Sequence, residues 1–479
     1  MRLDGLIAEA SLRELGLLEV VVGGQATEVV ALTMDSRQAT PGALFACVPG
    51  HTRDGHAFAA AAVAGGAVAV LSERPLDLAV PQVVVSSVRR AIGPLADALF
   101  GHPSRSLVVV GVTGTNGKTT TCALLQGAFQ ANGWTSDTIG TLTQQRTTPE
   151  APELQNLLAD WRDGGGHAIA MEVSSHALVQ HRVDAVHFAA GVFTNLTPEH
   201  LDYHHNMDDY FEAKAMLFSP ERLELAVINR SDPWGQRLIE RLLKAAVAVE
   251  TFGPEDAAEL DLSVTKSRFV WDGQTITVNL GGRFNVANAL AAATCARALG
   301  VPSDAIAAGV AGVDGVRGRF QPVDAGQPFT VLVDYAHTPD GLSQALRAAR
   351  ELTQGRLLVV FGAGGDRDHD KRPLMGAAAA QLADLAVVTS DNPRSEDPDE
   401  IIEQVVAGAA DGSNLVIEPD RAAAISTALA NAQPGDVVII AGKGHEPGQE
   451  INGRTIPFDD AETARKSLVR ILTSRRQPG

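Results

Sequence analysis

Apolar and polar positions alternate between two patterns along this 479-residue chain. Short runs rich in valine, isoleucine and leucine are followed by longer alanine-rich stretches, and this order repeats almost throughout. Alternating predicted strands and helices are typical of α/β domains with mostly parallel sheets. The pattern breaks at GHPSRS, residues 101–106, and again in a turn-rich stretch near residue 322. We therefore predict three domains, at residues 1–101, 102–321 and 322–479.

One strand-to-helix junction, VVVGVTGTNGKTTTCALL, occupies residues 108–125. Its loop ends in Gly117-Lys118-Thr119 and is a variant phosphate-binding loop, because Val112 stands where the strict pattern has its first glycine. Small residues let backbone N–H groups approach phosphates, and the following helix offers a positive N-terminus. A chance glycine turn would not explain the flanking strand and helix. The junction predicts nucleotide binding without specifying a reaction.

Three apolar runs in the last third of the chain also end in loops. They are RLLVVFGAGG, LAVVTSDNP and DVVIIAGKG, at residues 356–365, 385–393 and 436–444. Open α/β sheets bind ligands beyond the carboxyl ends of their strands, so these loops are candidate binding segments. FGAGGDR is only a weak match to a dinucleotide-binding loop of an oxidoreductase, because Arg367 stands at the third glycine position.

Composition narrows the class of protein. The formal net charge of -18 argues against broad nucleic-acid binding, which needs basic surfaces. Cys47, Cys122 and Cys295 have no zinc or disulfide spacing, and we expect free buried thiols in a reducing compartment. The N-terminus does not have the pattern of a signal peptide, and the most apolar run, AFAAAAVAGGAVAVL, is too short for a membrane span. We expect a cytoplasmic protein.

Candidate metal ligands follow the phosphate loop. Glu172 ends an apolar strand, where a carboxylate can hold magnesium, although most acids at strand ends have no such role. His200, His204 and His205 lie close together, but their spacing fits neither an HExxH helix nor a zinc finger. Lys214 follows in a helical stretch with apolar neighbours, and its simplest interpretation is a surface lysine with its amine in water.

In this order, GTNGKTT, MEVSSHAL, TNLTPEHLDYH and EAKAMLF resemble the Mur ligase family, the cytoplasmic ATP-dependent amino-acid-adding enzymes of peptidoglycan synthesis. RFNVANALAA, GRFQPV, VDYAHTPDGL, GGDRDHDKRP, SDNPR and AGKGHE extend the resemblance over nearly the whole chain. It implies an N-terminal UDP-binding α/β domain, a central P-loop ATPase-like parallel sheet and a C-terminal Rossmann-like domain. The motifs are most similar to the member that extends UDP-N-acetylmuramoyl-L-alanyl-D-glutamate, and we expect a monomer.

The resemblance also implies ATP, Mg²⁺ and a lysine carbamylated by CO₂. Catalytic roles fall on Lys118, His200, Lys214 and Arg319. The implied ATP contacts are Gly114, Thr115, Asn116, Gly117, Lys118, Thr119, Thr120, Asn285, Asn288, Arg319 and Asp334. The implied metal ligands are Thr119, Glu172, His200 and Lys214 as its carbamate. Carbamylation would turn a cation that repels magnesium into an anion with oxygen ligands.

Two further groups of residues resemble the family's substrate contacts. For the UDP-linked substrate they are Ser36, His51, Thr52, Thr147, Thr148, Ser174, Gln180 and Arg182. For the incoming amino acid they are Arg367, Asp391, Asn392, Arg394, Gly442 and Glu446. In this family DNPR, here residues 391–394, marks enzymes that add meso-diaminopimelate, whose distal zwitterion needs an acid and an arginine. An ordinary Asn-Pro turn and an L-lysine-adding ligase are the alternatives.

The implied reaction joins meso-diaminopimelate to the D-glutamyl γ-carboxylate through an acyl phosphate. A nucleotide-driven switch or transport ATPase would explain the phosphate loop but not the substrate motifs in three domains. Folylpolyglutamate synthase shares the phosphate loop and the metal-site lysine, but it does not account for DNPR or the N-terminal motifs. The chain departs from the family where Glu199, His205 and Gln321 replace the usual Asp, Gly and Glu.

Overall fold

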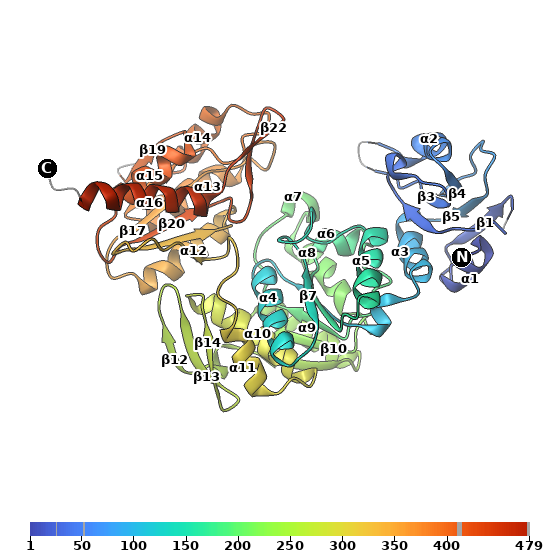
Figure 1. Ribbon diagram of the computed structural model, residues 1–479, viewed down its shortest axis with the longest axis horizontal. Coiled ribbons are helices and arrows are strands. Elements are labelled where there is room, and N and C mark those ends of the chain that lie inside the picture. The colour runs from blue at the N-terminus through green and yellow to red at the C-terminus, as the bar shows by residue number, and fades with distance from the viewer. Residues whose placement is uncertain (25, 51–52, 410–413, 477–479) are drawn as a thin grey trace.

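The computed structural model describes the 479-residue chain except residues 25, 51–52, 410–413 and 477–479. Three α/β units follow one another, and the central unit lies between the N-terminal unit (blue) and the C-terminal unit (orange to red), as Figure 1 shows. Each unit is built on its own sheet of mostly parallel strands, so the predicted fold class is confirmed. The domain limits after residues 101 and 321 stay a prediction.

The N-terminal unit has a five-stranded sheet with the order β1-β5-β4-β3-β2, in which only β1 is antiparallel to its neighbour. The strands are β1 (Leu18–Val22), β2 (Ala31–Thr33), β3 (Ala43–Ala46), β4 (Ala67–Ser72) and β5 (Gln82–Val85). The α-helices are α1 (Leu3–Glu9), α2 (Ala59–Ala64) and α3 (Val88–Leu99), with short 3₁₀ helices at Ser36–Gln38 and Gly55–Phe58. Strands β3 and β5 are wholly buried, which fits sequences that are apolar except for Gln82.

The central unit has a six-stranded parallel sheet with the order β11-β10-β9-β6-β8-β7. Its strands are β6 (Val108–Thr113), β7 (Ser136–Ile139), β8 (Ala168–Glu172), β9 (Ala190–Phe193), β10 (Leu225–Asn229) and β11 (Ala248–Phe252). Because β6 lies between β8 and β9, the loop that follows it emerges beside the carboxyl ends of both neighbours. The register pairs Val112 with Glu172, which places this acid next to the phosphate loop.

Helices cover the central sheet, and an antiparallel sheet lies alongside it (Figure 1). The α-helices are α4 (Lys118–Ala131), α5 (Ala151–Asp163), α6 (Ser175–Val179), α7 (Leu201–His204), α8 (Met207–Ala215), α9 (Pro233–Lys244), α10 (Arg283–Ala298) and α11 (Ser303–Ala311). The antiparallel strands are β12 (Ala258–Leu262), β13 (Ser267–Trp271) and β14 (Gln274–Val278), and 3₁₀ helices occupy Pro103–Ser106, Met216–Phe218 and Pro254–Asp256.

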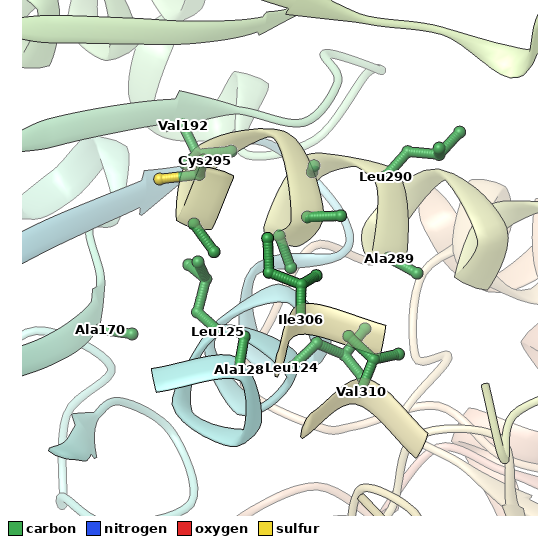
Figure 2. Close-up of a cluster of buried hydrophobic side chains, with 14 of the residues drawn as sticks. Leu124, Leu125, Ala128, Ala170, Val192, Ala289, Leu290, Cys295, Ile306 and Val310 are labelled. Carbon is green, nitrogen blue, oxygen red and sulfur yellow. The ribbon is translucent and has the colours of Figure 1, made fainter. Parts of the chain in front are cut away.

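The core around α4 holds the phosphate loop in place. Leu124, Leu125 and Ala128 of α4 pack with α10 and α11, as Figure 2 shows. The crossing of α4 and α11 is close, because a Cβ on Gly127 would lie 2.6 Å from the Gly309 carbonyl oxygen. Such dense packing leaves α4 little room to move, so the loop at its N-terminus is held by the buried core.

The C-terminal sheet has the order β15-β16-β20-β17-β18-β19 and is parallel except for β15. The strands are β15 (Gln321–Pro322), β16 (Thr330–Asp334), β17 (Leu357–Phe361), β18 (Leu385–Val388), β19 (Leu415–Ile417) and β20 (Val437–Ala441), with a hairpin of β21 (Gly448–Ile451) and β22 (Arg454–Pro457). The helices are α12 (Pro339–Leu352), α13 (Lys371–Leu382), α14 (Pro398–Val406), α15 (Arg421–Asn431) and α16 (Asp460–Arg476). The three predicted apolar strands are β17, β18 and β20.

Two expectations from composition can be compared with the fold. All three cysteines are buried and unpaired, which confirms the prediction of free thiols. Within the residues that the structure describes, none of the helices has the length and apolar character needed to cross a membrane.

Candidate functional site

A cavity of about 280 Å³ lies where the central and C-terminal units meet. Its walls come from the phosphate loop, the end of β8, the segment before α7, the start of α10 and the segment from β16 into α12. Its lining includes many of the predicted nucleotide and metal residues, among them Thr115, Asn116, Gly117, Lys118, Thr119, Thr120, Glu172, His200, Asn285, Asn288, Arg319 and Asp334.

The phosphate loop needs glycine at two positions. Gly114 has φ +150° and Gly117 has φ +88°, in the region that side-chain-bearing residues rarely adopt. A Cβ on Gly114 would overlap Thr194 Oγ1, and one on Gly117 would overlap Asn288 Oδ1. The loop backbone can therefore follow this path only without side chains here. The path ends at the N-terminus of α4, where unpaired N–H groups and the helix dipole attract anions.

Two lysine amines converge on one carbonyl oxygen of this loop. Lys118 Nζ donates to Gly114 O at 2.9 Å and to Thr115 O at 2.8 Å, while Lys214 Nζ donates to Gly114 O at 2.8 Å. Burial lowers the pKa of Lys214 well below its usual value, and the Lys118 charge lowers it further against the opposing pull of Glu199. Burial also lowers the pKa of Lys118, although Glu199 and Glu172 oppose this shift.

Lys214 corrects one interpretation of the sequence. The amine does not lie in water: the residue is only 1% exposed and its Nζ lies 4.6 Å from the centre of the Tyr210 ring. The face of helix α8 that carries Lys214 points inward, toward the phosphate loop, because Tyr210, Phe211 and Ala215 pack in the core. A lysine with a lowered pKa is partly present as a neutral amine, the form that reacts with electrophiles.

The predicted acid and its neighbours form a polar wall opposite the loop. Glu172 accepts hydrogen bonds from Thr141 N at 2.8 Å and from Thr141 Oγ1 at 3.2 Å. Arg319 reaches across from the C-terminal side, and its Nη2 donates to Thr119 Oγ1 at 3.1 Å. The Arg319 guanidinium also lies 4.6 Å from the centre of the Tyr335 ring. This arginine therefore joins the third unit to the hydroxyl expected to hold magnesium.

Glu199 lies in the site, although the sequence motifs predicted no catalytic or binding role for it. It lines the cavity, and its Oε1 lies 3.7 Å from His200 Nε2. Burial tends to raise the pKa of Glu199, but the nearby charges of His200 and Lys118 outweigh burial and lower it. The sequence contained one indication of this position, because Glu199 directly precedes the predicted site residue His200 in TPEHLD. Tyr335 and His337, from the YAHTP segment, line the same cavity.

Another departure from the family has a backbone explanation. His205 has φ +63° and ψ -41°, and Asn206 N donates to His204 O at 2.7 Å. This three-residue turn is strained for a residue with a side chain and suits glycine. The usual glycine of the family thus matches the conformation that His205 adopts.

The expected adenine and ribose contacts lie at the edge of the cavity. Asn288 Nδ2 donates to Asn285 Oδ1 at 3.1 Å, and Asn285 Nδ2 donates to Gly281 O at 2.9 Å. Asp334 accepts from Phe320 N at 2.7 Å and from Ala336 N at 2.9 Å, and its burial raises its pKa. In this arrangement both Asp334 oxygens organise the backbone around the cavity.

The predicted contacts to the peptide arm form one network beside Glu172. Thr148 Oγ1 donates to Glu172 O at 2.9 Å, and Ser174 N donates to Thr148 Oγ1 at 3.1 Å. Arg182 donates to Thr148 O at 2.9 Å and to Gln180 Oε1 at 2.7 Å. The structure thus brings Thr148 together with three predicted residues of a later segment, Ser174, Gln180 and Arg182.

The other predicted contacts to the UDP-linked substrate are less connected to this network. Thr147 Oγ1 lies 3.1 Å from Thr141 Oγ1, which also binds Glu172. Ser36 lies in the N-terminal unit, in the 3₁₀ helix Ser36–Gln38. His51 and Thr52 lie outside the described residues.

The predicted amino-acid contacts meet at the carboxyl ends of β17, β18 and β20. Asn392 Nδ2 donates to Glu446 Oε2 at 2.8 Å, and Arg394 Nε lies 3.3 Å from Glu450 Oε2. Gly442, with φ +114°, lies so close to Asp391 that a Cβ would be 2.5 Å from Asp391 Oδ2. The DNPR segment is therefore tied to charged partners. Arg367 is exposed on the loop after β17.

These features define a three-unit α/β protein with a nucleotide-type phosphate loop on its central sheet and a charged cluster at the strand ends of its C-terminal sheet. Protein-family models match in the same order: "Mur ligase family, catalytic domain" at residues 28–99, "Mur ligase middle domain" at 112–296 and "Mur ligase, glutamate ligase domain" at 318–444. The chain is 46% identical to UDP-N-acetylmuramoyl-L-alanyl-D-glutamate--2,6-diaminopimelate ligase of Streptomyces avermitilis, over 92% of each chain. It belongs to the Mur ligase family.

Solved structures agree with this membership. One of a UDP-N-acetylmuramoyl-L-alanyl-D-glutamate--2,6-diaminopimelate ligase matches with a TM-score of 0.67 and 34% identity, covering 96% of this chain and 98% of that one. The MurF ligase from Thermotoga maritima in complex with ADP matches with a TM-score of 0.63 and 19% identity, covering 94% and 99%. At that identity the second likeness concerns the fold alone.

The phosphate loop generates a direct prediction. Gly117→Ala should weaken ATP binding by about tenfold or more, because a Cβ would collide with Asn288 and displace the loop N–H groups. Titration with a fluorescent ATP analogue measures this change. Gly133→Ala is the matched control, since Gly133 follows α4 with φ +79° but has nothing within 4 Å of its Cβ position. Equal losses in both variants would contradict a role for the loop path.

Proposed function

We propose that this chain joins meso-diaminopimelate to the D-glutamyl γ-carboxylate of UDP-N-acetylmuramoyl-L-alanyl-D-glutamate, with conversion of ATP to ADP and phosphate. The observation that carries the proposal is the strand-end site around Asp391, Asn392 and Arg394. It combines carboxylates, which suit an ammonium group, with an arginine, which suits a carboxylate, and a zwitterion has both groups. The relatives are named for diaminopimelate, which favours this amino acid over L-lysine.

The proposed chemistry needs no nucleophile from the protein. The γ-carboxylate attacks the γ-phosphorus of ATP, so that ADP leaves and an acyl phosphate forms. The amine of diaminopimelate then attacks the acyl carbon, loses a proton, and phosphate leaves. Lys118, Arg319 and the N-terminus of α4 offset the charge of the two anions and hold them in position. Arg182 and its network suit a carboxylate of the peptide arm.

The side chains present fit Mg²⁺ and a carbamylated lysine. Thr119, Glu172, His200 and the carbamate of Lys214 would supply the ligands. When bound, Mg²⁺ would stabilise negative charge on the transferring phosphoryl group. The fit rests on Lys214: its buried amine shares Gly114 O with the Lys118 cation, and its neutral form would add CO₂ and lose one proton to give an anion that this cation attracts.

The nucleotide and location follow from the same proposal. The Thermotoga maritima relative holds ADP, as expected of a protein with this fold that uses ATP. ATP and UDP-linked precursors are cytoplasmic compounds, so we propose a cytoplasmic enzyme.

Removing the Lys214 amine should abolish most of the activity. Lys214→Ala should lower kcat by about 100-fold or more, because the site loses the proposed carbamate and its charge balance. The measurement is ADP release under saturating substrates, with and without added formate or bicarbonate as a replacement anion. Lys244→Ala, at the exposed end of α9, is the matched control. Full activity of Lys214→Ala without either anion would disprove the carbamate.

Arg394 should govern recognition of the distal carboxylate. Arg394→Ala should raise the KM for meso-diaminopimelate about tenfold or more while leaving the KM for ATP unchanged, since Arg394 does not line the cavity at the phosphate loop. Arg454→Ala, on the exposed strand β22 of the neighbouring hairpin, is the control. A proportional rise in both KM values would refute the assignment.

The overall proposal is tested by substrate-dependent ADP release. The purified chain, ATP, Mg²⁺ and UDP-N-acetylmuramoyl-L-alanyl-D-glutamate are mixed with meso-diaminopimelate, L-lysine or no amino acid. We expect release with diaminopimelate and formation of the UDP-linked tripeptide. Release with lysine alone would keep the ligase and overturn its specificity, whereas release indifferent to every substrate would favour an ATP-driven switch or transporter.

A further inference from the structure

One cation of the strand-end site belongs to none of the predicted contacts. Lys443 follows strand β20 and is fully buried, with 0% of its surface exposed. Its neighbours Gly442 and Gly444 have φ +114° and +55°, and a Cβ on Gly444 would lie 2.8 Å from Gly318 O. The glycines on both sides let the backbone turn so sharply that the long side chain of Lys443 points into the unit.

The Lys443 amine contacts three of the residues expected to bind the amino acid. Its Nζ lies 3.2 Å from Asp391 Oδ1, 2.7 Å from Asn392 Oδ1 and 3.5 Å from Glu446 Oε2. A lysine amine carries three protons and accepts no hydrogen bond, so these three oxygens use its whole donor capacity. Lys443 therefore influences a ligand through these three side chains and does not contact the ligand itself.

The amide of Asn392 takes its orientation from this lysine. Asn392 Oδ1 accepts from Lys443 Nζ and from Glu450 N at 3.0 Å, and these donors require the oxygen to face them. Asn392 Nδ2 then faces Glu446 Oε2, to which it donates at 2.8 Å. Without the lysine, the amide would lose its charged donor and Glu446 would lose a neighbouring cation.

The lysine also sets the local charge. Among the three groups in direct contact, Asp391 and Glu446 bring two negative charges and Lys443 one positive charge, which leaves one negative charge; Lys371 is a further cation that acts on Asp391 from outside this group. The buried pair of Arg421 and Asp460 behind the cluster, joined at 2.7 Å, is neutral by itself. One negative charge in this group suits one ammonium group, while Arg394, which lies 3.3 Å from Glu450, would turn to the carboxylate of the ligand. Two net negative charges would attract an ammonium group more strongly, but they would repel the carboxylate beside it.

We propose that Lys443 is a positioning and specificity residue, which orients Asn392 and Glu446 and limits the negative charge of the site so that a zwitterionic end is preferred over a plain ammonium. This inference rests on the proposed function and deepens it. It makes Lys443 responsible for part of the discrimination between meso-diaminopimelate and L-lysine, a role that DNPR alone does not explain.

The test compares Lys443→Met, which removes charge and donors, with Lys443→Gln, which keeps two donors without the charge. The readouts are the KM values for meso-diaminopimelate, ATP and the UDP-linked substrate, and the ratio of kcat/KM for diaminopimelate over L-lysine. Lys443→Met should raise the diaminopimelate KM about tenfold or more, with the other two KM values within about twofold of wild type. Lys443→Gln should have a diaminopimelate KM closer to that of the wild type. Both variants should lower the ratio of kcat/KM for diaminopimelate over L-lysine about tenfold.

Arg356→Met is the matched control for stability. Arg356 precedes β17, at the opposite end of the same sheet, and its Nη2 pairs with the buried Asp436 at 2.8 Å. It should lower the melting temperature while leaving the diaminopimelate KM and the ratio unchanged. If Lys443→Met does not fold, the inference is tested by the ratio of kcat/KM for diaminopimelate over L-lysine in Lys443→Gln.

Two results would overturn the inference: a wild-type ratio in Lys443→Gln, or an equal rise of all three KM values in the folded Lys443 variants. Either result, with diaminopimelate-dependent wild-type activity, rejects the role of Lys443 alone. Wild-type activity that needs no diaminopimelate would reject the proposed function itself.

Discussion

The shared carbonyl of Gly114 is the contact on which the central site depends. Lys118 and Lys214 both donate to this oxygen, and both amines lie out of bulk water, where two positive charges repel each other strongly. The core holds them there: α4 packs against α10 and α11, and α8 is anchored by Tyr210 and Phe211. Rigid packing thus holds both amines beside one carbonyl oxygen, in a cavity that the carboxylates of Glu172 and Glu199 also line.

The sheet order explains how the rest of the site is assembled around this point. Parallel strands direct their carboxyl ends to one edge, so the loop after β6 meets Glu172 of β8 although 54 residues separate Lys118 from Glu172 in the chain. Polar contacts close the cavity from the C-terminal side, among them Arg319 with Thr119, and Thr197 Oγ1 with Asp340 Oδ2 at 2.7 Å. The phosphate loop and the charged cluster around Asp391 therefore belong to different sheets.

Sequence reasoning yields proposals where candidate chemistry lies in contiguous residues. It proposed roles for the phosphate loop, the strand-end acid and DNPR because each lies within a short segment whose backbone shape and side chains act together. It was wrong about the environment of Lys214, since the helical pattern around that residue does not reveal which face meets the phosphate loop. Glu199 and Lys443 received no role, because each also interacts with a charge on a distant segment, Lys118 for Glu199 and Asp391 for Lys443.

The sequence by itself determined the α/β class, the two kinds of strand-end loop and the residue types available at each, because local backbone preference and hydrophobic pattern depend on neighbouring residues. The tertiary structure decided which charges meet. It placed two lysines on one carbonyl oxygen, an arginine of the C-terminal side on Thr119, and a buried lysine between Asp391 and Glu446. These effects arise from burial and distance, and both are properties of the folded chain.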